Sequence, residues 1–356
     1  RRVLFRSNFG LDIANKRDYN YTTSKITTST GYGKGGNGYT KKMSRLTENI
    51  LSYMNEWGDH RFTATGVYSW QNYMYETLSI SGNGFANDET GAWDMGQANR
   101  ETVEYGSDKY ENSLISWTGR VTYAYKDRYL LTATARYDGS SRFGENNKWG
   151  FFPSIGLAWR ASEEEFLAGN KVITNLKVRG SFGVTGNQEI GNYKSLAQLK
   201  VDNYIYNDTE IQGFYETIGN PDLKWERANQ FDIGIDLSLW NRIHVTADYY
   251  HRKTSDLLYN VPIPSTSGFS SMLSNVGSVL NKGWELSITG NIIDLNDLKI
   301  DATVNLSRNT NKIKELYNDV QSITLKSGLG LSSYLKVGES LNSRYRSEEH
   351  TSELQS

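Results

Sequence analysis

Residues 112–160, NSLISWTGRVTYAYKDRYLLTATARYDGSSRFGENNKWGFFPSIGLAWR, carry the pattern that decides the fold. Apolar and polar side chains alternate through residues 115–126 and again through residues 131–138, after the turn Lys126-Asp127-Arg128. Period-two alternation places the apolar side chains on one face of a β-strand and the polar side chains on the other. Both strands are long, the polar face carries arginines, and aromatic residues stand near the strand ends. This combination predicts a membrane β-barrel with lipid outside and water inside.

The same alternation recurs along the chain and predicts eleven strands joined by connections that are in turn long and short. That order is typical of an up-and-down barrel with short periplasmic turns and long extracellular loops. A soluble β-sandwich also alternates, but its strands are usually nearer about five or six residues. The expected strands are 9–21, 43–55, 61–75, the pair within 112–138, 151–160, 175–185, 231–239, 243–250, 284–292 and 298–307. The predicted fold class is therefore all-β, an antiparallel up-and-down transmembrane β-barrel.

Aromatic residues cluster where the expected strands meet the short turns. Amphipathic rings favour the boundary between lipid and water, because one end of the ring is apolar and the other is wet. The residues concerned are Tyr123, Tyr125, Tyr129, Trp159 and Trp240.

Composition excludes several functions. The 356 residues include 39 basic and 40 acidic side chains, and no stretch gathers the basic ones, so nothing favours nucleic acid as a partner. Cysteine is absent, which removes disulfides, thiolate metal sites and cysteine nucleophiles. No run approaches the roughly 20 apolar residues that a membrane helix needs.

Both ends of the chain look foreign to the fold. Residues 346–356, RSEEHTSELQS, and residues 1–7, RRVLFRS, resemble translated sequencing adapter. We expect residues 8–345 to form part of a barrel, with the true N-terminus and its export signal missing.

A glycine-rich stretch at residues 31–36 formally matches the dinucleotide fingerprint GxGxxG. That fingerprint requires an apolar strand before it and a helix after it. Here another strand follows, so the prediction is a flexible loop. Residues 162–169, SEEEFLAG, are expected to hold a helical turn.

The sequence predicts no catalytic, cofactor-binding or metal-binding residue, and no enzyme. The four histidines, at 60, 244, 251 and 350, lack the spacing of metal ligands on a helix. Five acidic residues are expected on the water-filled face as solvated charges, without an acid–base pair of the glycosidase kind. These five are Asp232, Asp236, Asp248, Glu285 and Asp301.

Aromatic residues in the long loops have two possible roles: they stack on sugar rings or meet a partner, or they pack within the loops. Substrate-binding residues are therefore left unassigned. The residues are Trp93, Tyr105, Trp149, Tyr193, Tyr204, Tyr206, Phe214 and Tyr215.

Several long motifs in fixed order resemble the barrel of the SusC/RagA family of TonB-linked outer-membrane transporters. The longest covers residues 118–167, TGRVTYAYKDRYLLTATARYDGSSRFGENNKWGFFPSIGLAWRASEEEFL. The others are LKVRGSFGVTGNQEIGNY at 176–193, GNPDLKWERANQFDIGIDLSLW at 219–240, DYYHRKTSDLL at 248–258, NVGSVLNKGWEL at 275–286 and VGESL at 337–341.

The resemblance implies about half of a twenty-two-stranded barrel whose lumen is plugged by a separate N-terminal domain. It implies import of oligosaccharides or peptides across a Gram-negative, Bacteroidetes-like outer membrane, with a SusD-like surface lipoprotein as a lid and TonB supplying energy. The plug, its TonB-contacting segment and the C-terminal strands are expected to be missing. The alternatives are a TonB-dependent siderophore or haem receptor and a soluble β-sandwich that binds glycans.

Overall fold

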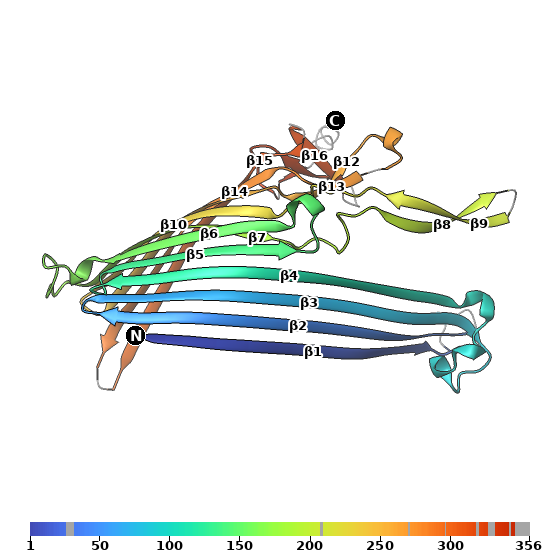
Figure 1. Ribbon diagram of the computed structural model, residues 1–356, viewed down its shortest axis with the longest axis horizontal. Helices are drawn as coiled ribbons and strands as arrows, with labels where there is room; N and C mark the ends of the chain where they lie inside the picture. Colours follow the sequence, from blue (N-terminus) through green and yellow to red (C-terminus); the bar gives the residue numbers. More distant parts are fainter. Residues whose placement is uncertain are drawn as a thin grey trace, which may run out of the picture. The chain divides into compact units, whose positions relative to one another are not determined.

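The computed structural model describes residues 1–25, 32–206, 209–269, 271–295, 297–317, 320–326, 332–341 and 343–345. Its main element is an eleven-stranded sheet in which neighbouring strands follow one another along the chain (Figure 1). The strands are β1 (Arg2–Thr22), β2 (Gly33–Trp57), β3 (His60–Phe85), β4 (Glu104–Tyr125), β5 (Tyr129–Ser140), β6 (Trp149–Arg160), β7 (Ile173–Asn187), β10 (Glu226–Leu239), β11 (Ile243–Ser255), β14 (Ser278–Asp294) and β15 (Lys299–Glu315). The predicted eleven strands and their order are confirmed.

The register of the sheet keeps the two faces distinct from strand to strand. Val178, Ile235 and Ala247 lie opposite one another on β7, β10 and β11, and the row continues through Leu286 and Leu306. The adjacent row, displaced by one residue, begins with Lys177, Asp236 and Thr246. A slip of one residue in any strand would exchange these faces. Ile235 is 44% exposed and Leu306 50%, so the apolar face is uncovered within this chain.

Four short connections join strands at one end of the sheet. Residues Lys126 and Asp127, between β4 and β5, have φ values of 51° and 52°, and Trp240 and Asn241, between β10 and β11, have the same two values. Two consecutive left-handed residues form the hairpin turn whose twist matches that of the strands. The β10–β11 turn therefore has its two left-handed residues at 240 and 241, between the expected strands 231–239 and 243–250. The remaining two short connections are residues 58–59 and 295–298.

One connection departs from the predicted alternation of lengths. Residues 161–172, between β6 and β7, lie at the short-turn end but exceed the opposite connection at 141–148. They contain the 3-10 helix η5 (Ala161–Glu163), so the helical turn predicted for this segment is present.

The strands extend further than their apolar alternation predicts. β3 continues to Phe85 and β4 begins at Glu104, so the expected polar connection at 76–111 shrinks to residues 86–103. β2 begins at Gly33, which makes the prediction of a flexible loop wrong from that residue onward, while Gly31 lies outside the described residues. β1 begins at Arg2, so it includes most of the expected adapter at 1–7. The added residues at the starts of β2 and β4 are mostly polar or glycine, so no apolar alternation marks them. In the added part of β3, Leu78 and Ile80 still alternate with polar residues, and the strand continues with them.

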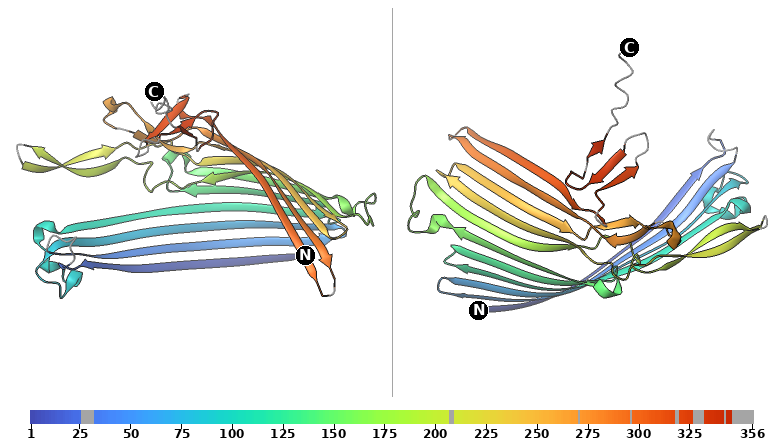
Figure 2. Two further views of the ribbon diagram at one scale, coloured as in Figure 1. Left: turned by 180° about the vertical axis from the view of Figure 1, so that it is seen from behind. Right: turned by 90° about the horizontal axis from the view of Figure 1, so that it is seen from above.

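Three small sheets occupy the ends of the strands opposite the short turns (Figure 2). They fall in stretches where the sequence predicts only loops or fading periodicity. The pairs are β8 (Gln198–Tyr206) with β9 (Thr209–Thr217) and β12 (Leu258–Pro262) with β13 (Ser271–Asn275). The third comprises β16 (Ser322–Lys326), β17 (Ser332–Lys336) and β18 (Arg344–Tyr345).

Internal contacts divide the chain into two compact units. Unit 1 comprises residues 1–4, 51–66 and 117–356, and unit 2 comprises residues 5–50 and 67–116. In unit 1, Trp225 packs against Phe143 and Phe152 with ring centroids 4.8 and 5.2 Å apart, and its Nε1 donates to the carbonyl of Lys148.

The core of unit 2 is small and lies beneath the β3–β4 connection. Its buried members are Phe85, Ala92 and Ala98. The connection folds into three 3-10 helices, η1 (Gly91–Trp93), η2 (Met95–Gln97) and η3 (Arg100–Thr102). Asp94 and Asn99 cap η2 and η3 by accepting from backbone N–H groups, so the connection has a defined structure. Within the described residues no helix has both the length and the apolarity to cross a membrane.

Candidate functional site

A charged cluster lies on the polar face of the sheet in unit 1, centred on Arg179 of β7. Its Nε donates to Oδ2 of Asp236 at 3.2 Å, and its Nη2 donates to Oδ2 of Asp248 at 2.9 Å. Lys177 Nζ is 3.7 Å from Asp236. To reach β11, the Arg179 side chain crosses Gly234 of β10, where a Cβ would stand 2.6 Å from the guanidinium carbon. Glycine at 234 therefore leaves room for this ion-paired network, and a larger residue would displace the ends of the Arg179 and Asp248 side chains.

The acidic residues predicted on the water-filled face thus differ in their surroundings. Asp236 and Asp248 are ion-paired rather than simply solvated. Glu285 lies directly opposite Asp248 in the register and so shares its face, while Asp301 lies opposite Asn291. Asp232 accepts hydrogen bonds from its neighbours Ser181 and Gln230.

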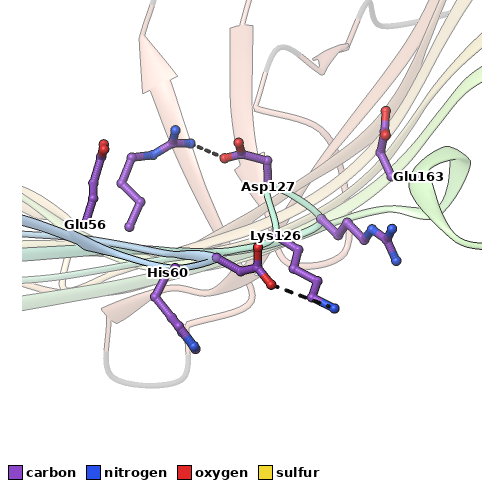
Figure 3. A pocket seen from close by; sticks show the side chains of 9 residues that line it. Glu56, His60, Lys126, Asp127 and Glu163 are labelled. Carbon is purple, nitrogen blue, oxygen red and sulfur yellow. Dashed lines mark hydrogen bonds and ion pairs between the residues drawn. The ribbon is translucent and has the colours of Figure 1, made fainter.

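A polar pocket of about 550 Å³ opens at the short-turn end of unit 1 (Figure 3). Arg61 pairs with Asp127, and Lys126 lies 3.9 Å from Asp59, so opposite charges from two turns face each other. The pocket is lined by Glu56, Gly58, Asp59, His60, Arg61, Lys126, Asp127, Arg128 and Glu163. This arrangement ties neighbouring turns together by ion pairs.

The described histidines have partners of other kinds. His60 Nδ1 is 2.7 Å from the Tyr123 hydroxyl, and His244 Nδ1 is 2.9 Å from Ser238 Oγ. His251 lies opposite Phe231 in the sheet, and His350 lies outside the described residues. Among the residues that the structure describes, no group of three or more His, Asp or Glu side chains has an arrangement that would hold a metal ion.

Two of the predicted boundary aromatics meet one carboxylate at the short-turn end, and we call Tyr129, Trp159 and Glu164 the aromatic anchor. The Tyr129 hydroxyl donates to Glu164 Oε1 at 2.6 Å, and Trp159 Nε1 donates to the same oxygen at 3.0 Å. Arg128 donates to Oε2 at 3.3 Å. The hydrogen bond from Tyr129, followed by that from Trp159, holds the pKa of Glu164 below its usual value. Sequence reasoning missed Glu164, because only geometry distinguishes it from its two acidic neighbours.

In unit 2, the glycine-rich stretch packs against a tyrosine. A Cβ at Gly35 would stand 2.7 Å from both Tyr21 Cδ2 and Ala92 Cβ, and a Cβ at Gly33 would overlap the Tyr21 hydroxyl. That hydroxyl donates to Asp88 Oδ1 at 2.8 Å. Burial, and then the hydrogen bond to Asp88, raise the pKa of Tyr21 to about 12. Gly33 and Gly35 therefore leave room for the side chain of Tyr21.

Of the aromatic residues predicted in loops, Trp93 and Tyr193 lie in connections, whereas Tyr105 lies in β4 and Trp149 is the first residue of β6. Trp93 is 61% exposed and Tyr105 is 77% exposed. Trp149 stacks on Tyr137 with centroids 4.9 Å apart, and Tyr193 is exposed with a positive φ of 59°. Positions 204, 206, 214 and 215 lie in β8 and β9, and their side chains are outside the described part of the structure.

Comparison with protein families gives one match over almost the whole chain. Residues 3–350 match the model described as TonB dependent receptor-like, beta-barrel.

Individual relatives agree with this match. The chain is 37% identical over 321 residues to TonB-dependent receptor P26 of Formosa agariphila, an alignment covering 88% of this chain and 32% of that protein. It is 39% identical to TonB-dependent receptor SusC of Bacteroides thetaiotaomicron, over 61% of this chain and 22% of SusC. The chain therefore spans at most about a third of the length of these relatives.

A solved structure shows the same fold. The structure of the RagAB peptide transporter aligns with a TM-score of 0.85 and 28% identity, covering 94% of this chain and 37% of the matched chain.

Proposed function

The chain belongs to the TonB-dependent receptor β-barrel family, in its SusC/RagA branch, and on that premise we propose that it forms part of the wall of an outer-membrane importer. The cargo is an oligosaccharide or a peptide, in keeping with the relatives SusC and RagAB. A SusD-like surface lipoprotein closes the outer mouth. TonB drives release through a plug that lies in another part of the full-length protein.

The difference between the two faces of the sheet carries this proposal. Ile235 and Leu306 stand uncovered on one face, where water would make their exposure costly and hydrocarbon would not. Asp236 and Asp248, on the opposite face, are charged and held by Arg179. A wall with these faces separates a lipid phase from an aqueous lumen.

The role of the wall is to hold a wide polar passage rather than to perform chemistry. The Arg179 network fixes side chains that would otherwise extend into the lumen, because each carboxylate is bound to a guanidinium held between strands. Specificity then depends on the loops, the plug and the lipoprotein.

Labelling of the full-length receptor in native membranes tests the orientation. This chain has no cysteine, so a single cysteine introduced at Ile235, or at Asp236 in a second variant, gives it one labelling site. We expect a spin label at 235 to be relaxed by oxygen, which concentrates in lipid, and a label at 236 by a water-soluble nickel chelate. If neither reagent reaches a label at position 235, that residue lies in the core of a soluble β-sandwich instead.

Uptake measurements test the activity. We expect entry of oligosaccharides or peptides to require both TonB and the neighbouring SusD-like lipoprotein. A receptor that instead supports growth only on iron chelates, without the lipoprotein, would contradict the importer assignment.

A further inference from the structure

We propose that Trp93 and Tyr19 form a binding platform for a neutral sugar ring on unit 2. Trp93 is 61% exposed, while its neighbour Ala92 is fully buried. A large apolar side chain is thus presented to solvent by a segment that is itself anchored in a core. Trp93, Tyr19 and the surrounding polar residues belong to the described part of unit 2.

The Trp93 ring is held in a fixed orientation by its neighbours in the protein. Tyr19 stacks on Trp93 with ring centroids 4.7 Å apart and planes 18° apart, which covers one face of the indole. The Tyr19 hydroxyl accepts a hydrogen bond from the Ala92 N–H at 3.2 Å. Gly91, with φ of 54°, leaves no room for a Cβ beside the Tyr19 hydroxyl. Preorganisation of this kind reduces the entropy lost on binding.

Fixed hydrogen-bond acceptors occur in the same segment. Asp88 accepts from the Tyr21 hydroxyl and from the N–H and hydroxyl of Ser24. Asp94 accepts from the Gly96 N–H and from Gln97 Nε2. Asp94 directly follows Trp93 in the chain, so its carboxylate can accept a sugar hydroxyl beside the ring and repels an anion there. A neutral pyranose, with an apolar C–H face and hydroxyls around its rim, fits these surroundings better than a uronic acid or a sulfated sugar.

The size of the platform argues against a protein partner. A specific protein interface buries about 800 Å² on each side, whereas one aromatic side chain buries about 150–250 Å². Ala92, before Trp93 in the chain, is fully buried, and Asp94, after it, is polar, so this part of the segment presents one apolar ring, which matches the size of one sugar ring. The proposal rests on the proposed importer only for its access to external glycans, since binding is measurable without transport.

Direct binding to the full-length receptor in detergent tests the platform. The probes are hexasaccharides of glucose, mannose and xylose, with hexagalacturonate as the anionic comparison, measured by calorimetry. We expect at least one neutral hexasaccharide to bind and the galacturonate not to bind. Trp93→Ala should weaken that binding roughly tenfold through loss of one stacking face, and Trp93→Phe should restore most of it.

Tyr105→Ala is the matched control, because Tyr105 is 77% exposed on the same unit and should leave binding unchanged. Resistance of residues 86–103 to protease shows that each variant is folded. The platform is overturned if no neutral hexasaccharide binds, if folded Trp93→Ala binds as well as the parent, or if Trp93→Ala instead loses a copurifying lipoprotein.

The same variants separate this proposal from the importer. TonB-dependent uptake without sugar binding would remove the platform and leave the importer. If the receptor binds sugar through Trp93 but shows no TonB-dependent uptake, the importer is overturned and the platform remains.

Discussion

The aromatic anchor of unit 1 and the Trp93 platform of unit 2 use the same chemical groups in opposite ways. In the anchor, the polar tips of Tyr129 and Trp159 both donate to Glu164, so the edges of the rings are held and the carboxylate is fully engaged. In the platform, Trp93 is held through its face by Tyr19, and elsewhere in unit 2 the phenol of Tyr21 donates to Asp88. The anchor therefore fixes its rings by their polar edges, whereas the platform fixes Trp93 by one face and leaves the ring exposed.

The largest expected effect comes from filling the space beneath the platform. Gly35→Ala places a Cβ 2.7 Å from both Ala92 and Tyr21, so the core must shift, and overpacking of this kind costs about 2 kcal/mol. We expect protease to cleave residues 86–103 of this variant faster than in the parent protein. Gly66→Ala, which has no atom within 4 Å of the added Cβ, is the control, and equal resistance of the two variants would contradict the packing argument.

A smaller effect on thermal stability distinguishes Trp159, which is held by its edge, from Trp93, which is held by its face. Trp159→Phe removes the indole N–H that donates to Glu164 and should lower the thermal midpoint of the receptor by a few degrees. Trp93→Phe keeps a ring to stack on Tyr19 and should leave the midpoint unchanged. Thermal unfolding of both variants in detergent measures the difference. Equal losses would mean that the two rings are held alike.

Acid should weaken both clusters in the same direction. Hydrogen bonds hold the pKa of Glu164 below 4.5 and that of Asp88 below 3.8. A carboxyl group with a lowered folded-state pKa adds stability above its unfolded pKa, and that stability is lost as pH falls through the lowered value. We expect Glu164→Gln to reduce the loss of thermal stability below pH 4.5.

Asp88→Asn should reduce acid-induced proteolysis of residues 86–103 without affecting the anchor. A Glu164→Gln variant whose acid profile matches that of the parent would show that Glu164 does not contribute to the acid response.

The smallest effect concerns Tyr21 at high pH. Its folded-state pKa is raised to about 12 from 10.0, so its contribution is complete below pH 10 and is lost as the pH rises towards 12. The ultraviolet absorbance of tyrosinate should contain one late-titrating component that disappears in Tyr21→Phe. If the late component remains in that variant, it belongs to another tyrosine.

The sequence predicted the sheet well, because apolar and polar side chains alternate along most of its strands. Ile235 and Asp236 differ enough to assign two faces from the sequence alone. Gly33 and Gly35 have no side chain to contribute to the alternation, so the sequence did not predict that β2 begins at Gly33. Their role, which is to leave room for Tyr21, depends on the folded structure. The β8–β9 and β12–β13 pairs were missed because any apolar alternation in them is short: in β8, Leu199 and Val201 are followed by Asn203, and β12 and β13 have five residues each.

The site residues were less predictable for a different reason. Glu163, Glu164 and Glu165 are equivalent in the sequence, and only the third dimension directs Glu164 to Tyr129 and Trp159. In the sequence Gly234 is likewise equivalent to any other strand glycine, because its role depends on the Arg179 side chain that crosses it in the folded sheet.

The chain-order arrangement of the sheet has an evolutionary consequence. Because every strand pairs with its neighbour in sequence, removal of β10 and β11 together would leave β7 and β14 running in opposite directions and able to join. Duplication of the same hairpin would preserve direction equally well. A gene of this architecture can therefore gain or lose circumference in steps of two strands, through ordinary insertions and deletions, without rethreading the remaining chain.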